Sequence, residues 1–354
     1  MDIFENAGFR TAPALLDRVY EARQLFERGQ GSDNLASYQL AEAFSTTDFP
    51  VLLGKAFEYE AIRNVQAAVD ETAAFAYQTA TADFNPKKLR DLFGGGTFFD
   101  VAEGEEYKGG TLEETEVEFK TGKVGKTYGL TFELRRNRDY TGLANFPNIL
   151  ANEAVNTKNR KVFEVLVNDS GLRTDFFGTV DNKPLTPDNL QAAIVALSMK
   201  EDYAGNLVDT SNLQLLVPPS LELEANRIIG ASELEMQVTG GTRVTKTRIQ
   251  NPFRGLVTVV KSRWFAQLNT SATRSTAWAL LPAGTSTLPS VIFAKLAGED
   301  LEIRVKRDQG ERVGGGAVAI DEGSFKDDTI WFRGRDFMGA TPGFRDAVYG
   351  SAGQ

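Results

Sequence analysis

The segment NFPNILANEAVNTKNRKVFEVLVN, residues 145–168, decides how the rest of the chain is arranged. Its apolar residues recur at the spacing of one helical face, and Pro147 suits the first turn, where a proline loses no hydrogen bond. The pattern predicts one helix of about 21 residues, on the order of 30 Å long, which is enough to span a domain. Asp169, Ser170 and Gly171 are expected to end it.

The composition excludes several classes of protein. The 354 residues are 42% hydrophobic and 25% charged, with a formal net charge of −9, so the chain lacks the basic character of a nucleic-acid binder. It has no cysteine and no histidine, and therefore no disulfide, thiolate nucleophile or imidazole base. No apolar run is long enough to span a membrane. We expect a soluble intracellular protein of structural or binding function, with no catalytic residue, cofactor or metal.

Two glycine motifs look like nucleotide-binding signatures but fail in their context. Gly125-Lys126-Thr127 matches the end of a phosphate-binding loop, yet Lys120 stands where that motif requires glycine. Residues 128–134 then alternate as a strand, where the motif requires a helix. The triplets at 94–96 and 314–316 lack the strand-then-helix setting of dinucleotide sites, so we interpret them as turns.

The N-terminal residues predict an arm. A helix is expected to begin near Thr11 and Pro13, and a polar break at residues 30–33 separates it from a short helical pattern at 35–44. A helix on such a connector can pack on a neighbouring molecule. Its expected contact face consists of Leu15, Leu16, Val19, Tyr20 and Phe26.

The next segment predicts part of a first core. Residues 48–54 precede a helix expected from Lys55 to Val69. A short strand and a turn at Asn85-Pro86 follow within residues 73–93. The side chains expected to face inward from the helix are Phe57, Ile62, Val65 and Val69.

Residues 97–138 predict an unusually long, charged β-hairpin. Residues 116–120 and 128–134 alternate, so we expect them to form two strands that pair with each other. The first arm is acidic and the second basic. Two interpretations remain open: the arms neutralise each other, or they complement an adjacent subunit. The candidate inter-subunit residues are Glu103, Glu105, Glu106, Lys108, Glu113, Glu114, Lys120, Lys123 and Lys126.

The remainder predicts an α/β unit followed by a β-rich end. Helices are expected from Thr186 to about Met199 and after Pro218-Pro219, and a long polar loop is expected from Gly240-Gly241 to Asn251-Pro252. The final strands should return to the first core. The expected strands are 213–217, 257–260, 278–281, 291–295, 302–305, 317–320 and 329–335.

With this order of elements, the chain resembles the major capsid proteins of tailed bacteriophages with the HK97-type fold. No single motif is specific, but their order and spacing together are. The residues that carry the resemblance are Asp48-Phe49-Pro50-Val51-Leu52-Leu53-Gly54, Tyr128 through Asp139, Leu215-Leu216-Val217-Pro218-Pro219-Ser220-Leu221, Asn251-Pro252-Phe253, Trp278-Ala279-Leu280-Leu281, and Arg333-Gly334-Arg335-Asp336-Phe337-Met338-Gly339-Ala340.

The resemblance implies an α+β fold with four named parts: an N-terminal arm, an extended hairpin called the E-loop, a peripheral (P) domain with a spine helix, and an axial (A) domain. The implied ranges are 1–46 for the arm, 47–96 and 139–184 for the P domain, 97–138 for the E-loop, about 185–310 for the A domain, and 311–354 for C-terminal strands that complete the P domain.

The implied function is assembly. Such a protein forms hexamers and pentamers of an icosahedral shell around double-stranded DNA, assembled in the bacterial host cytoplasm and found in the virion. The implied partners are other copies, scaffold, portal and decoration proteins, and DNA through weak local contacts, without a membrane. Two alternatives remain: an encapsulin-like compartment shell, and a β-rich carbohydrate-active or carbohydrate-binding protein.

Overall fold

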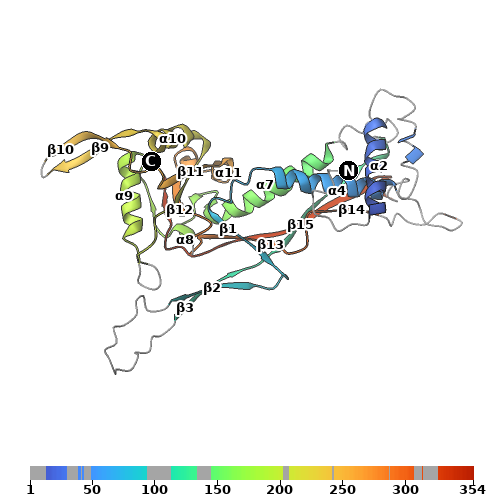
Figure 1. Ribbon diagram of the computed structural model, residues 1–354, viewed down its shortest axis with the longest axis horizontal. Coiled ribbons are helices and arrows are strands. Elements are labelled where there is room, and N and C mark those ends of the chain that lie inside the picture. The colour runs from blue at the N-terminus through green and yellow to red at the C-terminus, as the bar shows by residue number, and fades with distance from the viewer. Residues whose placement is uncertain are drawn as a thin grey trace, which may run out of the picture. The chain divides into compact units, whose positions relative to one another are not determined.

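A computed structural model of the chain, shown in Figure 1, combines helices with parallel and antiparallel strand pairs, so the α+β prediction is confirmed. The described residues form two compact units. Unit 1 lies within Met1–Val69, Gly122–Thr157 and Leu296–Met338, and unit 2 lies within Asp70–Thr121, Lys158–Lys295 and Gly339–Gln354. The structure describes residues 13–29, 39–40, 42–43, 49–93, 113–133, 145–201, 207–240, 243–286, 288–306, 313 and 326–354.

The elements have the following bounds. The helices are α2 (Pro13–Gly29), α4 (Phe49–Ala67), α7 (Phe146–Leu166), α8 (Thr174–Phe177), α9 (Pro187–Ser198), α10 (Glu222–Gly230) and α11 (Arg263–Gln267), with 3-10 turns at Pro219–Leu221 and Ala272–Ser275. The strands are β1 (Ala76–Thr81), β2 (Lys87–Phe93), β3 (Glu113–Phe119), β4 (Gly122–Leu130), β5 (Val167–Asn168), β6 (Gly171–Leu172), β7 (Val180–Asp181), β8 (Leu213–Val217), β9 (Glu233–Gly240), β10 (Arg243–Gln250), β11 (Val257–Lys261), β12 (Trp278–Pro282), β13 (Val291–Leu296), β14 (Glu302–Val305), β15 (Ile330–Pro342) and β16 (Tyr349–Ser351).

The long helix predicted from residues 145–168 is confirmed as α7. Its first turns belong to unit 1, where Phe146 and Leu150 are buried, and its last turns belong to unit 2, where Phe163 and Leu166 are fully buried. The chain then turns through the short β5–β6 pair, in which Gly171 has a φ of +118°, a conformation that favours glycine.

Aromatic rings form the core of unit 1. Phe57 of α4 makes edge contacts with Phe26 of α2, at 5.5 Å between ring centroids, and with Phe146 of α7, at 5.9 Å. Phe146 in turn contacts Tyr128 of β4 at 5.0 Å and Phe332 of β15 at 5.8 Å. Edge-to-face aromatic pairs add to the free energy gained by burial. Two helices, a sheet and the start of α7 therefore share one core.

In unit 1 the sheet is centred on β15, which pairs antiparallel with β14 on one edge and with β4 on the other. Ile330 and Phe332 point into the core, because alternate residues of a strand face opposite sides. Gly334 lies on the same inner face, where an added Cβ would be 2.7 Å from Leu150 Cδ2 of α7. The glycine therefore lets the helix approach the sheet closely.

Two predictions about the helices of unit 1 are wrong. The helix expected from Lys55 begins at Phe49, because Pro50 lies in its first turn, a position that proline tolerates. Val69 is 84% exposed and does not face inward. Phe57 and Ile62 are buried as predicted, and Val65 is partly buried against the same core.

The main sheet of unit 2 has the order β11-β8-β12-β16-β7. The strands β8 and β12 are buried along their whole length, as their apolar sequences predicted. Thr186 accepts a hydrogen bond from the Asn189 backbone N–H at 3.2 Å, so the predicted cap of α9 is confirmed. The last strand, β16, pairs with β12 and β7, so the prediction that every C-terminal strand returns to the first core is wrong.

The prediction of a long polar loop from Gly240-Gly241 to Asn251-Pro252 is also wrong. Residues 233–240 and 243–250 pair antiparallel as β9 and β10. At the end of β10 the Asn251 side chain donates hydrogen bonds to the backbone carbonyls of Ile228, Ile229 and Ala231 at 2.7–2.9 Å. Asn251 thus satisfies carbonyl groups at the C-terminus of α10 that would otherwise lack partners.

The predicted strand partners of the charged hairpin are wrong as well. β3, which contains the alternating residues 116–119, pairs antiparallel with β2, and β4 pairs with β15. Only Lys120 and Thr121 separate β3 from β4, and the chain changes sheets there. The long two-stranded element therefore consists of β2 and β3, which we call the ribbon, and the predicted strand 317–320 lies outside the described residues.

We predict that Phe26→Ala lowers the free energy of unfolding of the unassembled chain by about 3–5 kcal/mol, because it removes a buried ring that contacts Phe57. Val69→Ala, at an exposed site, should change it by less than about 0.5 kcal/mol. Urea denaturation followed by circular dichroism measures both. Equal stability of the Phe26→Ala variant and the wild type would contradict the placement of α2 in this core.

Candidate functional site

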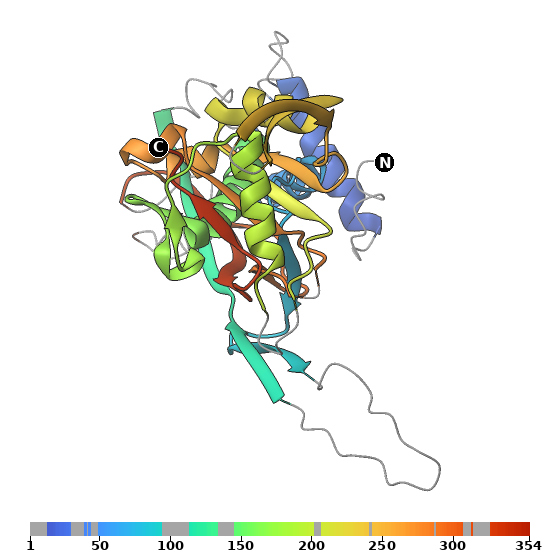
Figure 2. The same ribbon diagram turned by 90° about the vertical axis from the view of Figure 1, so that its left-hand side faces the viewer.

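The ribbon places opposite charges across its ladder. Lys88 is paired in register with Glu118, and its ammonium forms an ion pair with the neighbouring Glu116 carboxylate. The two strands run beside each other in both views (Figures 1 and 2). Because the acidic strand faces the basic start of β2, the expected neutralisation between arms exists, but with partners other than those predicted.

The base of the ribbon is the part that packs on its own chain. Leu89 and Val117 are directly opposite each other and pack against Phe119, Ile292 and Ala294, which are buried. An isolated two-stranded ribbon is marginally stable in water. The contact at its base therefore anchors the ribbon and sets the direction in which it leaves unit 2.

The candidate hairpin residues fall into three groups. Glu103, Glu105, Glu106 and Lys108 lie outside the described residues, and Glu113 and Glu114 lie in β3 with side chains that are not described. Lys120 follows β3 and is exposed. Lys123 and Lys126 belong to β4 and not to the ribbon.

Lys126 has partners within its own unit. Its Nζ lies 2.8 Å from the Glu153 carboxylate of α7 and 5.2 Å from the centre of the Tyr128 ring. These contacts attach β4 to the long helix. The Lys126 side chain nevertheless remains 64% exposed, so the ion pair contributes little to stability.

The predicted contact face of the N-terminal helix is wrong for two of its residues. Val19 and Phe26 are fully buried, Val19 against Ala56 and Tyr59 of α4, so they have no surface left for a neighbour. Tyr20 is 36% exposed. Leu15 and Leu16 lie in α2, but their side chains are outside the description.

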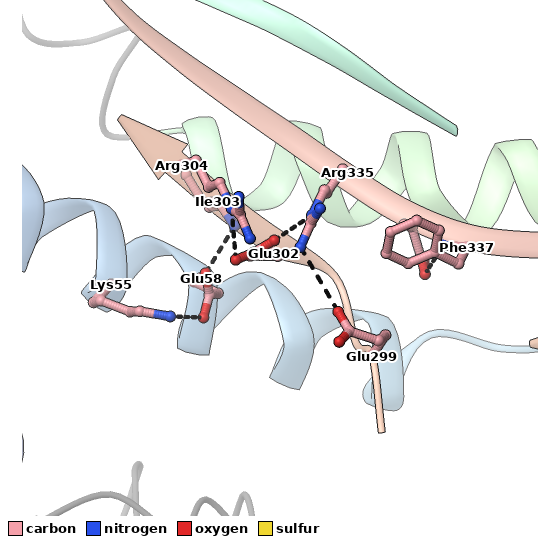
Figure 3. A network of polar contacts seen from close by, with 9 residues as sticks. Lys55, Glu58, Glu299, Glu302, Ile303, Arg304, Arg335 and Phe337 are labelled. Atoms are coloured by element: carbon pink, nitrogen blue, oxygen red, sulfur yellow. Dashed lines mark hydrogen bonds and ion pairs between the residues drawn. The ribbon is translucent and has the colours of Figure 1, made fainter. Parts of the chain in front are cut away.

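A polar network that the sequence did not reveal joins α4, β14 and β15 in unit 1 (Figure 3). The Glu58 side chain is 8% exposed. One of its carboxylate oxygens accepts a hydrogen bond from the Ile303 N–H at 2.7 Å, and the other lies 2.5 Å from Lys55 Nζ. A buried carboxylate needs such partners to offset its desolvation. Glu58 therefore fixes α4 to the outer edge of β14.

Glu302 of β14 is the centre of the second half of this network. Its carboxylate accepts hydrogen bonds from Arg335 and, at 2.8 Å, from Arg304 (Figure 3). Partial burial raises the pKa of Glu302, but these two guanidinium groups outweigh it and hold the pKa below the ordinary value of 4.5. The ionised form is therefore the one that the fold stabilises.

The described residues offer no metal site and no membrane span. Within the described ranges, no three histidine, cysteine, aspartate or glutamate side chains gather as metal ligands would. None of the described helices is both long and apolar enough to cross a bilayer. The most distinctive features of the described residues are the charged ribbon, the long helix α7, and the sheet of unit 1 with its polar network around Glu58 and Glu302.

The sequence from residue 113 to residue 350, about two thirds of the chain, matches the phage capsid protein family, and the chain belongs to that family. It is a structural phage capsid protein, located in the virion capsid, and the resemblance to phage capsid proteins seen in the sequence is confirmed. The family match favours the capsid function over the encapsulin-like and carbohydrate-binding alternatives.

Solved structures give distant similarities. The capsid structure of the cyanophage P-SCSP1u is 12% identical, with a TM-score of 0.45, 78% of this chain covered and 85% of that one. The structure of Gordonia phage Cozz is 13% identical, with a TM-score of 0.46 and coverages of 78% and 84%. A virus-like particle from Pyrococcus furiosus is 9% identical, with a TM-score of 0.42 and coverages of 84% and 98%. No curated protein matches the chain.

We predict that acid weakens the fold through Glu302. Because its pKa is lower when folded than when unfolded, its contribution is complete above about pH 4.5 and is lost as pH falls through the folded pKa. Glu302→Gln should therefore reduce the loss of stability between neutral pH and pH 3, measured by urea denaturation at each pH. Identical pH profiles for variant and wild type would contradict this role.

Proposed function

We propose that this capsid protein assembles into hexamers and pentamers of an icosahedral shell around double-stranded DNA, and that its ribbon is the E-loop that lies on a neighbouring subunit. The observation that carries this is the ribbon itself, which contacts its own core through Leu89 and Val117 at its base. The remaining length needs a surface to rest on, because a two-stranded ribbon is marginal alone.

The other parts are assigned accordingly. The E-loop runs from β2 to β3, about residues 87–119, and α7 is the spine helix of the P domain. The A domain contains the buried sheet around β8 and β12. Because Val19 and Phe26 lie in their own core, α2 belongs to the P domain and only residues before it remain as an arm.

Because the net charge is −9, we expect the chain to contact DNA only through local patches of lysine and arginine. Weak contact also suits DNA that must later be released. Scaffold, portal and decoration proteins are the expected partners besides other copies, and assembly is expected in the host cytoplasm. Assembly and containment are the work we propose for it, and the lack of histidine and cysteine, which supply the commonest catalytic side chains, supports this function.

We predict that replacing residues 95–111 by Gly-Ser-Gly abolishes shell formation while the subunit stays folded, because the replaced residues lie beyond both ribbon strands. Negative-stain microscopy counts the particles, and thermal unfolding of unassembled subunits checks the fold. Leu223→Ser, at an 83% exposed site on α10, serves as the control. Intact shells from the shortened chain would overturn the assignment of the ribbon.

A further inference from the structure

The main sheet of unit 2 takes one of its inner strands from a segment far along the chain. β16 lies between β12 and β7, with Ser351 opposite Trp278 of β12 and Gly350 opposite Val180 of β7. Within the described residues, β16 is the only strand that pairs with β7. Without β16 the sheet would end at β12, and β7 would be detached from it.

Residues 343–354, which we call the strap, are fixed in place before β16 begins. The Gly343 N–H donates a hydrogen bond to the Ser290 carbonyl at 2.7 Å, and the Phe344 N–H donates to the Pro289 carbonyl at 3.0 Å. A Cβ on Gly343 would clash with the Pro289 oxygen, so this close approach of two backbones requires glycine.

The strap then holds the segment that connects α7 to α9. The Ala352 N–H donates to the Asp181 carbonyl at 2.7 Å, and the Tyr349 hydroxyl donates to the Asp181 carboxylate at 2.8 Å. The fully buried Ser351 hydroxyl donates to the Lys183 carbonyl at 2.7 Å and accepts from the Lys183 N–H at 2.9 Å. Without the strap these groups would lose their partners, which costs free energy where they are buried.

Apolar contacts fit the strap closely into unit 2. Val348 is buried, and the Tyr349 ring lies 5.3 Å from the ring of the fully buried Trp278. Gly350 lies against Phe177 of α8, where an added Cβ would be 3.0 Å from the ring. The strap therefore completes the core on this side of the sheet and leaves no room for a larger residue at position 350.

The strap joins parts of the chain that are far apart in sequence. Tyr349 and Asp181 are separated by 168 residues, and Thr276, which donates to the Ala352 carbonyl at 2.8 Å, is 76 residues away from it. Contacts at such separations form late, because closing the intervening loops costs chain entropy before the contacts repay it. Many domains fold as they are synthesised, but unit 2 lacks an inner strand until residue 351 has been added.

We propose that the strap is a conformational lock that closes last. Unit 2 stays open between β12 and β7 until the strap inserts, and a subunit joins a shell only after this step. Such a lock keeps partly made chains out of the shell. The assembly half of this proposal rests on the proposed function, whereas the order of closing does not.

Refolding of the full chain from urea tests the order. Short pulses of hydrogen exchange at increasing times, read by mass spectrometry, should find β8, β11 and the β14–β15 pair protected before the strap and residues 178–185. Samples moved to assembly conditions at the same times should form sedimenting shells only once the strap is protected.

Two matched glycine variants separate the lock from global stability. Gly350→Val adds bulk against Phe177 and should lower the exchange protection of the strap in the folded chain at least about tenfold, while β14 and residues 330–338 keep wild-type protection. Gly230→Val, where an added Cβ meets nothing within 4 Å, should leave the strap protected as in the wild type. Ser351→Ala, which removes the buried hydroxyl without adding bulk, replaces Gly350→Val if that variant does not fold.

The proposal is overturned if the strap gains protection together with or before β8 and β11, if the strap variant loses protection equally in both units, or if shells form before the strap is protected. Wild-type chains that form no shells under any condition would contradict the proposed function, and the order of protection would still decide whether the strap closes last.

Discussion

The fold depends on one helix with two apolar ends. Phe146 and Leu150 at the start of α7 belong to the core of unit 1, and Phe163 near its end contacts Phe75 and Phe265 in unit 2. Between these ends the helix is polar, with Lys158 held 2.5 Å from Asp70. One continuous helix therefore contributes buried apolar side chains to both cores.

The ion pairs at Asp70 and Glu302 share one property: each depends on the carboxylate being ionised. Burial raises the pKa of Asp70, but hydrogen bonds from Lys158 and Thr72 favour its ionised form and bring the pKa below its ordinary value. Arg304 and Arg335 lower the pKa of Glu302 in the same way. With no histidine in the chain, no side chain has an ordinary pKa between 5 and 8. The pairs at Asp70 and Glu302 should therefore persist across the neutral range and weaken as acid protonates their carboxylates.

The sequence predicted the positions of helices and strands better than it predicted which strands pair and which helices pack together. The periodicity of residues 145–168 and the apolar runs at β8 and β12 were sufficient because burial dictates those patterns. Alternation marked residues 116–119 as a strand, but alternation does not say which strand lies beside it, and β2 was the true partner. The amphipathic pattern of α2 likewise showed an apolar face without showing that α4 covers it. The network around Glu58 had no sequence signal, since it depends on residues brought together from α4 and β14.

The hydrogen bond between the buried Glu58 carboxylate and the Ile303 N–H affects how the edge of β14 behaves in an unassembled subunit. An exposed strand edge is a template on which another chain can add, and unchecked addition leads to fibres. At β14 the Ile303 donor is occupied by the Glu58 carboxylate, and a strand that displaced this carboxylate would remove one of the two partners of a buried charge. One backbone donor on this edge of the sheet is thus occupied by a side chain of the same subunit and is not available to an added strand.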